Sequence, residues 1–468
     1  MLAAVFVRVG SNFETLVHLL KGSLGTGILA MPNAFMHAGL ALGSVGTILI
    51  GSLCIYCLHV LLRQQFILCK MMRVPVLSYP RTMELALEKG PGPLRRLSKY
   101  SGSIVNAFLI VYQLGICCVY IVFVASNIKQ VCFFIDNFSL LCLPNRRMSL
   151  RAPIKIYAGG GNPIPDARIV IAATVGQVVD LHWRPVDVRL YMVILLLPLI
   201  LLNYVRNLKL LAPFSTIANL ITFVGLAITL YYLVDDVPSP AERRMLGEPM
   251  EFPLFVGTTL FSLEAVGVII ALENNMQTPG DFVGYTGVLN KGMSVIVFLY
   301  VLVGFVGYVK YGDDTMGSIT LNLPTEQILA QSVKIMFAVA IFITYALQCY
   351  VPVEIVWNSY LKHRMEDSSE CMQMFVEYLM RTGMVISTFL LAVAIPRLEL
   401  FISLFGALCL AALGIAFPAT IELCLLWPDK YGRGRWMLYK DLAIILCGVS
   451  GLLIGSYTSM LEIVRSML

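Results

Sequence analysis

The chain has 468 residues, of which 58% are hydrophobic and only 13% are charged. Soluble globular proteins carry about 25% charged and about 45–50% apolar residues, so this composition excludes that class and indicates an integral membrane protein. The formal net charge of +6 comes from 34 basic and 28 acidic side chains. No cleavable secretory signal, phosphate-binding loop or nucleic-acid-binding module is visible in the sequence.

Apolar segments long enough to cross a bilayer recur along the chain, since about twenty apolar residues form a spanning helix. The sequence therefore predicts an all-α integral membrane protein with about eleven transmembrane helices, numbered here as spans one to eleven. Residues 1–13 form a short N-terminal segment, and residues 14–468 form the transmembrane domain. The predicted spans are 14–36, 41–66, 101–126, 189–205, 211–234, 252–273, 291–310, 328–348, 378–396, 399–423 and 441–461.

The charge of the linkers predicts how the spans are oriented. Linkers that follow even-numbered spans are basic, as with Lys70 and Arg73 after span two. Linkers that follow odd-numbered spans lean acidic, as with Asp235 and Asp236 after span five. The positive-inside rule then places the N-terminus in the cytosol. In the first large basic linker, the stretch SYPRTMELALEKGP (78–91) predicts a short amphipathic helix on the cytoplasmic surface.

The segment 127–188 departs from this pattern because it is long, basic and contains the loop-like run YAGGGNPIPD. We expect a non-cytoplasmic loop, in which Asn137, followed by Phe and Ser, is a formal glycosylation acceptor. An alternative is that residues 131–177 are a retained intron. Valine codons begin with GT and one glutamine codon ends with AG, and removing Val131 to Gln177 joins the flanks in frame as SNIKQVVDLHW.

Span one contains its own helix breakers. Its central stretch GSLGTGILAMP (22–32) places Gly25 and Gly27 on either side of Thr26, with a proline further on. Glycine costs about 1 kcal/mol in a helix relative to alanine. Irregular backbone survives in a bilayer only where it lines a cavity or is buried in protein. The pattern therefore predicts an unwound segment, although close helix packing through small residues is the alternative.

Span six shows a second interruption, with a carboxylate in the middle of the apolar segment. The stretch FPLFVGTTLFSLEAVGVIIALENN (252–275) contains Gly257, Gly267 and Glu264. An ionisable residue at that depth is by default a functional-site candidate. Two interrupted helices five spans apart point to an inverted-repeat transporter with its site at the midplane. We therefore expect spans one to five and six to ten to form the two repeats, followed by span eleven.

The predicted breaks suggest the chemistry of the ligand. An unwound segment exposes backbone N–H groups at a half-helix N-terminus, where the helix dipole favours an anion. A substrate carboxylate fits there, and the freed carbonyl groups opposite can hold an ammonium group. An α-amino acid carries both groups on one carbon, so it is the ligand that this arrangement predicts.

Four stretches of the sequence resemble the proton-coupled amino-acid transporters within the amino acid/auxin permease group. They are TLVHLLKGSLGTGILAMPNAFMHAGL (15–40), YQLGICCVYIVFVASNI (112–128), LLPLILLNYVRNLKLLAPFS (196–215) and ITYALQCYVPVEIVW (343–357). The resemblance implies an eleven-helix, five-plus-five inverted repeat with helices one and six broken. It also implies symport of protons with small neutral amino acids such as glycine, alanine and proline. Members of the family sit at the plasma membrane or on lysosomes, and some signal nutrient supply to growth control.

The resemblance also assigns roles to individual residues. Gly25, Thr26 and Gly27 match the substrate-binding break, and His18 matches a first-helix histidine linked to proton coupling. Span six departs from the family pattern Phe-Ala-Phe-Glu-Gly-Ile-Gly, which puts substrate size in doubt. It reads Phe261-Ser262-Leu263-Glu264-Ala265-Val266-Gly267, so the glutamate and the final glycine are kept.

Other polar residues in the spans are candidates on physical grounds. Histidine has an ordinary pKa of about 6.5, so His18 could change charge across an acidic-to-neutral gradient. Glu264 could bind the substrate amine, carry the proton or form a buried ion pair. Tyr345 and Gln348, three residues apart, share one face of span eight, and we count Tyr345 among the substrate-binding candidates.

The sequence leaves several functional alternatives open. A sodium-coupled or uncoupled carrier on the same fold is one, with Ser387 or Thr388 as hydroxyl ligands for sodium. An amino-acid-sensing receptor that signals to growth control is another, and residues 131–177 could leave this chain inactive. No nucleophile–base set or metal-ligand cluster is recognisable among the five histidines. We therefore expect no enzyme, no metal and no cofactor beyond the coupling proton. The expected partners are small neutral amino acids, protons, the lipid bilayer and nutrient-signalling complexes.

Overall fold

The structure is a computed structural model. It describes residues 12–23, 25–142, 187–206, 208–263, 269, 273, 276, 281–284 and 287–467, without the side chains of 13, 14, 21, 136–142, 208–212 and 433. Every regular element among these residues is a helix. The first half contains α1 (Asn12–Ser23), α2 (Thr26–Ala38), α3 (Leu40–Met72), α4 (Tyr79–Lys89), α5 (Gly92–Cys142), α7 (Val188–Asn203) and α8 (Leu208–Val234).

The second half begins after an irregular connection. Its α-helices are α9 (Phe252–Leu263), α11 (Val288–Tyr311), α12 (Ile328–Val356), α13 (Glu370–Ala394), α14 (Leu398–Phe405), α15 (Phe417–Leu426) and α16 (Trp436–Met467). Two π-helices, η6 (Trp357–Leu361) and η8 (Gly406–Ala416), continue α12 and join α14 to α15. Short 3₁₀ helices occupy Pro240–Glu242, Gly312–Asp314, Ile319–Asn322, Lys362–Arg364 and Arg433–Arg435.

The helices agree with the predicted multi-span membrane fold. Eight helical segments among the described residues have the length and apolar composition to cross a bilayer. They contain α3, α5, α8, α11, α12, α13, the α14–α15 run and α16. The shorter apolar helices α7 and α9 coincide with predicted span four and the first half of span six, and α1 with α2 covers span one. The total of eleven spans stays a prediction.

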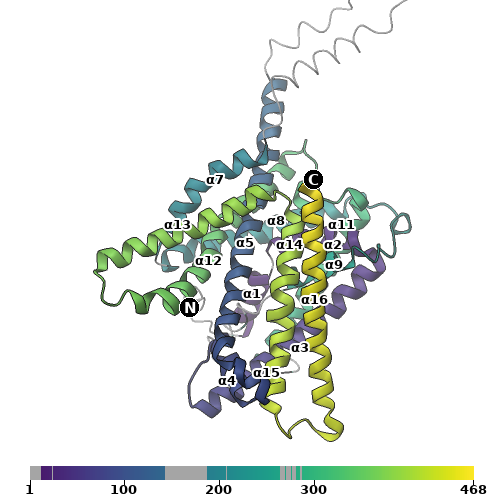
Figure 1. Ribbon diagram of the computed structural model, residues 1–468. Helices are drawn as coiled ribbons and strands as arrows, with labels where there is room; N and C mark the ends of the chain where they lie inside the picture. Colours follow the sequence, from purple (N-terminus) through teal and green to yellow (C-terminus); the bar gives the residue numbers. More distant parts are fainter. Residues whose placement is uncertain are drawn as a thin grey trace, which may run out of the picture.

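Span three is longer than the sequence analysis predicted. We expected it to end at residue 126, but α5 continues to Cys142. The sequence has neither glycine nor proline between Asn127 and Pro144, so nothing there breaks the helix. The far end of α5 projects beyond the other helices in Figure 1. The expected loop therefore cannot begin at 127, and the glycosylation candidate Asn137 has its side chain outside the described residues.

Four pairs of helices that occupy the same position in the two predicted repeats pack against each other. The second half of span one, α2, packs against α9 of span six. In the same way α3 packs against α11, α5 against α12, and α7 against α13. These are spans two and seven, three and eight, and four and nine. Contacts between spans n and n+5 are the ones that a five-plus-five repeat predicts.

Glycines allow α2 to lie close to its neighbours. The Phe35 ring is wholly buried between Gly43 of α3 and Gly304 of α11. A β-carbon at either glycine would lie within 2.8 Å of that ring. Pro32 likewise packs onto Gly307, where an added β-carbon would lie 2.5 Å from the proline Cγ. The small residues of α3 and α11 therefore hold α2 close to both helices, as small residues do between membrane helices.

The connection between α8 and α9 is docked onto the turn between α2 and α3. The amide of Leu40 donates to the carbonyl of Arg244 at 3.0 Å, and the amide of Gly247 donates to the carbonyl of Ala38 at 2.7 Å. Beside them, His37 Nδ1 lies 3.2 Å from a carboxylate oxygen of Glu251. This connection therefore fixes the end of α2 that lies away from the break.

The predicted amphipathic helix is confirmed as α4. It ends before Gly90 and buries its apolar face against α5 and α15, so it is more deeply packed than a helix lying on the surface. The Tyr79 hydroxyl donates to the carbonyl of Leu413 at 2.5 Å. In Figure 1, α4 and the beginning of α16 lie at one end of the helical body. The end of α16 and the far end of α5 lie at the other.

Candidate functional site

The predicted break in span one is present. Helix α1 ends at Ser23, and α2 begins at Thr26. Between them Gly25 adopts φ −122° and ψ −146°, and its amide donates to the carbonyl of Ser23 at 3.0 Å. Of the glycines in the stretch 22–32, Gly22 and Gly27 lie within the helices, and only Gly25 lies between them. Pro32 lies inside α2 without ending it.

Gly25 borders open space. No heavy atom of the described residues lies within 4 Å of the position that a β-carbon on Gly25 would take. The following residue, Thr26, is buried and begins α2. The first backbone amide groups of α2 therefore lie at the break. Such amides have no partner within the helix and carry its positive dipole end. The break therefore combines room beside the backbone with a site that favours an anion.

Gly27 fixes the contact between the two interrupted helices. A β-carbon on Gly27 would lie 2.7 Å from Ser262 Cα in α9, so only glycine permits the observed approach. The Ser262 hydroxyl lies 2.9 Å from the carbonyl oxygen of Gly27 and 2.8 Å from that of Thr258. Ser262 is only 3% exposed. The structure thus brings together two candidates that are far apart in the sequence.

Span six is described continuously up to Leu263, and beyond it only at residues 269 and 273. Phe261, the other aromatic candidate, is buried and meets the ring of Tyr112 from α5 edge-on, with 6.2 Å between ring centroids. Glu264 and Gly267, which carried the predicted second break, lie outside the described residues. The roles of Phe261 and Ser262 in substrate binding therefore stay predictions, with their packing known.

His18 lies on α1, five residues before that helix ends at Ser23. It is partly buried, and α1 packs against α11 through the neighbouring Leu19, which faces Gly292. Tyr300 of α11 donates its hydroxyl hydrogen to the carbonyl of Ser23, at the end of α1. Sequence reasoning missed Tyr300. The available signal was a tyrosine in an apolar span, whose hydroxyl needs a partner when buried.

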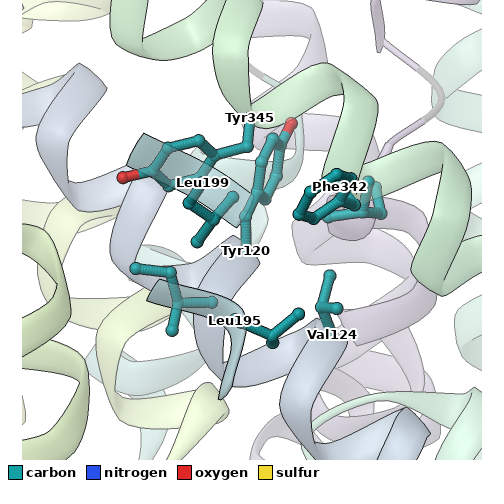
Figure 2. A pocket seen from close by; sticks show the side chains of 8 residues that line it. Tyr120, Val124, Leu195, Leu199, Phe342 and Tyr345 are labelled. Carbon is teal, nitrogen blue, oxygen red and sulfur yellow. The ribbon is translucent and has the colours of Figure 1, made fainter. Parts of the chain in front are cut away.

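Tyr345 lies in a different environment. Its hydroxyl is 2.8 Å from the Thr388 hydroxyl, which itself donates to the carbonyl of Val385. Its ring helps to line a cavity of about 10 Å³, which is about the room of one water molecule. Figure 2 shows its ring and that of Tyr120 beside this cavity, with the two hydroxyls pointing in different directions. The cavity is therefore too small for an amino acid.

The candidate sodium ligands do not face one another. The Ser387 hydroxyl is exposed and donates to the carbonyl of Gly383 in its own helix, whereas Thr388 is buried against Tyr345. Among the described residues, no group of three or more His, Cys, Asp or Glu side chains is placed to hold a metal ion. In the part of the break that the structure describes, the polar groups belong to the backbone and to small side chains such as Thr26 and Ser262.

Comparison with known proteins gives matches over most of the chain. The family described as "Transmembrane amino acid transporter protein" matches residues 8–152 and 167–461. The proton-coupled amino acid transporter-like protein pathetic of Drosophila melanogaster is 37% identical over 453 residues, which are 97% of this chain and 85% of that protein. The probable amino acid transporter skat-1 of Caenorhabditis elegans is 23% identical over 457 residues, 96% of this chain and 89% of that protein.

Proposed function

Because the chain belongs to the transmembrane amino acid transporter family, we propose that it carries small neutral amino acids across a membrane together with protons. Glycine, alanine and proline are the proposed substrates. The name of the Drosophila relative supports proton coupling. The observation that supports the substrate class best is the open space at Gly25, beside the first turn of α2.

The two charged groups of an amino acid would find complementary partners at this break. The carboxylate would accept hydrogen bonds from the amides that begin α2 at Thr26. The ammonium group would lie toward the last carbonyls of α1, where Ser23 already accepts from Tyr300. A zwitterion therefore satisfies both half-helix ends at once, whereas an anion or a cation alone would satisfy one.

The remaining candidates would form the walls of the site and the proton path. Gly27 and Ser262 hold α9 against α2, and Phe261 supplies an apolar surface beside Tyr112. We propose that Glu264 and His18 carry the coupling proton. Gly267 is the remaining member of the proposed substrate-binding set, whereas the cavity at Tyr345 is too small to hold an amino acid.

Uptake of labelled glycine, alanine and proline into cells that express the chain tests this function. We expect flux that is greater at an external pH of about 5.5 than at about 7.5 and is unchanged when sodium is removed. A shortened chain without residues 131–177 would be run in parallel, with surface expression measured for both. Flux from the shortened chain alone would identify that block as inactivating.

Two results would contradict the proposal. Sodium-dependent flux that ignores external pH would favour a sodium-coupled carrier. Saturable amino-acid binding without flux, in both surface-expressed chains, would favour a receptor that signals to growth control. The His18→Gln variant adds a further test, because we expect it to keep substrate binding while losing most of the stimulation by acid.

The proposed membrane is the plasma membrane or that of lysosomes and late endosomes, with the N-terminus in the cytosol. In uptake across an acidic surface layer and in export from an acidic lumen, protons move into the cytosol together with the substrate. Microscopy of the full chain with a small C-terminal tag, beside markers for both membranes, distinguishes the two locations.

A further inference from the structure

Three charged side chains meet where α3, α15 and α16 pack together. Lys440 Nζ lies 2.5 Å from a carboxylate oxygen of Glu422 and 3.0 Å from Asp441 Oδ1. Gln64 of α3 donates to the other carboxylate oxygen of Glu422 at 3.3 Å, and Lys440 also donates to the Tyr56 hydroxyl. The cluster thus connects the second, tenth and eleventh predicted spans.

The cluster contains two carboxyl groups and one cation. Asp441 is fully buried and Glu422 is 6% exposed. Lys440 Nζ, 3.0 Å from Asp441 Oδ1, is the cation that both carboxyl groups share, whereas Asp441 Oδ2 has no hydrogen-bond partner among the described residues. A buried carboxylate oxygen without a donor is costly, and two carboxylates beside one ammonium leave an excess negative charge. One bound proton removes that excess.

The described side chains around the cluster include no second cation paired with it. The other titratable side chains that face the cluster are Tyr56 and Cys57 from α3, Cys447 from α16, and Tyr431 from the connection before α16. None of them is a base, and among the described side chains only Lys440 pairs with either carboxylate. Arg435 is exposed in that connection. Among the described side chains, one ammonium group therefore faces two carboxyl groups.

We propose that Asp441 and Glu422 share one exchangeable proton and form a proton-binding site separate from the break. Lys440 is partly exposed, with 21% of its side chain accessible, so solvent at this end of the body can reach the cluster. The same end carries the basic linkers, which places the site at the predicted cytoplasmic face. A site there responds to the acidity of the cytosol rather than to that of the opposite side.

The proton would influence the helix that supports the break. Helix α15 continues through η8 into α14, where Ser403 donates to the carbonyl of Leu254 in α9 at 3.2 Å. Gly406 of η8 lies against the carbonyl of Gly257 in α9. π-Helical segments often occur at functional positions because they hold a helix in a less regular form. Loss of the proton at Glu422 and Asp441 would loosen α15 from α3 and α16, and this change would reach α9.

The proton itself is tested without transport, by infrared difference spectra of the full chain in lipid between about pH 6 and about pH 8.5. Ordinary carboxyl groups, with pKa values of about 4, do not titrate in this window. We expect the wild type to lose the C=O band of a protonated carboxylic acid on alkalinisation. In Asp441→Asn the band should decrease less than in the wild type. In Glu462→Gln, which changes a carboxyl at the other end of α16, it should decrease as much as in the wild type.

The outcomes separate the possibilities clearly. If Asp441→Asn does not fold, Glu422→Gln carries the same test, because the two groups share the proton. A wild type without the band, or a variant whose band equals that of the wild type, would overturn the proton site. Its effect on transport rests on the proposed function. We expect uptake in Asp441→Asn to lose its dependence on cytosolic pH, while Glu462→Gln behaves as the wild type.

Absence of flux in every chain would count against the proposed function alone, since the infrared band is read without transport. Flux in Asp441→Asn that depends on cytosolic pH as in the wild type would count against the regulatory effect, even if the band is present.

Discussion

Replacing Gly27 by alanine tests the contact that holds α2 against α9. The new β-carbon would lie 2.7 Å from Ser262 Cα, whereas ordinary van der Waals contact begins near 3.4 Å. Because the obstructing atom belongs to the backbone, it cannot turn aside as a flexible side chain would. The two helices must therefore separate locally, which also lengthens the 2.9 Å hydrogen bond from Ser262 to the carbonyl of Gly27.

The cost follows from these two effects. Overpacking of a well-packed interior costs about 1–3 kcal/mol. Loss of the hydrogen bond adds about 0.5–1.5 kcal/mol, since Ser262 keeps its bond to Thr258. We expect Gly27→Ala to destabilise the protein by about 2–4 kcal/mol.

Gly25→Ala is the matched control. No atom in the described part of the chain lies within 4 Å of the β-carbon at that position, and the backbone has a negative φ that alanine accepts. We expect its stability to change by less than about 0.5 kcal/mol. Its KM for amino-acid uptake should rise, because the methyl group occupies the proposed substrate space.

Thermal unfolding of the purified variants in detergent measures the first effect, and initial uptake rates over a range of substrate concentrations measure the second. Equal stability of the two variants would refute the steric reasoning at Gly27. A Gly25→Ala protein with unchanged KM would refute the placement of the substrate beside Gly25.

Three further predictions concern other parts of the structure. Glu377→Gln should cost about 3–5 kcal/mol, read as a lower unfolding temperature, because it leaves the guanidinium of Arg381, only 5% exposed, without its carboxylate at 2.8 Å. Phe35→Ala should cost about 3–5 kcal/mol by opening a cavity, seen as loss of folded protein in size-exclusion chromatography. The hydrogen bond from His37 lowers the pKa of Glu251 below its ordinary value of 4.5. The ionised Glu251 carboxylate therefore stabilises the protein above pH 4.5, and this stabilisation is lost as the pH falls below that value. Glu251→Gln should be less stable than the wild type at neutral pH and equally stable in acid, as measured by unfolding temperature.

Much of the architecture follows from segment length and breaker residues. Apolar segments about twenty residues long predicted the positions of the membrane helices, and the glycines around Thr26 predicted a break that the structure places at Gly25. The amphipathic pattern of 78–91 predicted α4. These features depend on local composition, which a single sequence contains.

Other features depend on long-range contacts, which the sequence does not contain. The length of α5 beyond residue 126 was missed because bilayer thickness was taken as the end of the helix. The hydrogen bond from Tyr300 to Ser23 joins residues far apart in the chain, as does the contact of Gly27 with Ser262. Likewise, packing brings Lys440 of α16 beside Glu422 of α15, a pairing that no local sequence pattern indicates. Tertiary packing therefore decides which polar residues meet.

The most direct test of the central claim is transport by the purified full-length chain in liposomes. A proton gradient, acidic outside, would be imposed, with labelled alanine added outside and a pH-sensitive dye inside. We predict that alanine accumulates inside above its external concentration, and that its addition accelerates acidification of the lumen. Alanine that only equilibrates, without any effect of the gradient or on internal pH, would contradict proton-coupled symport.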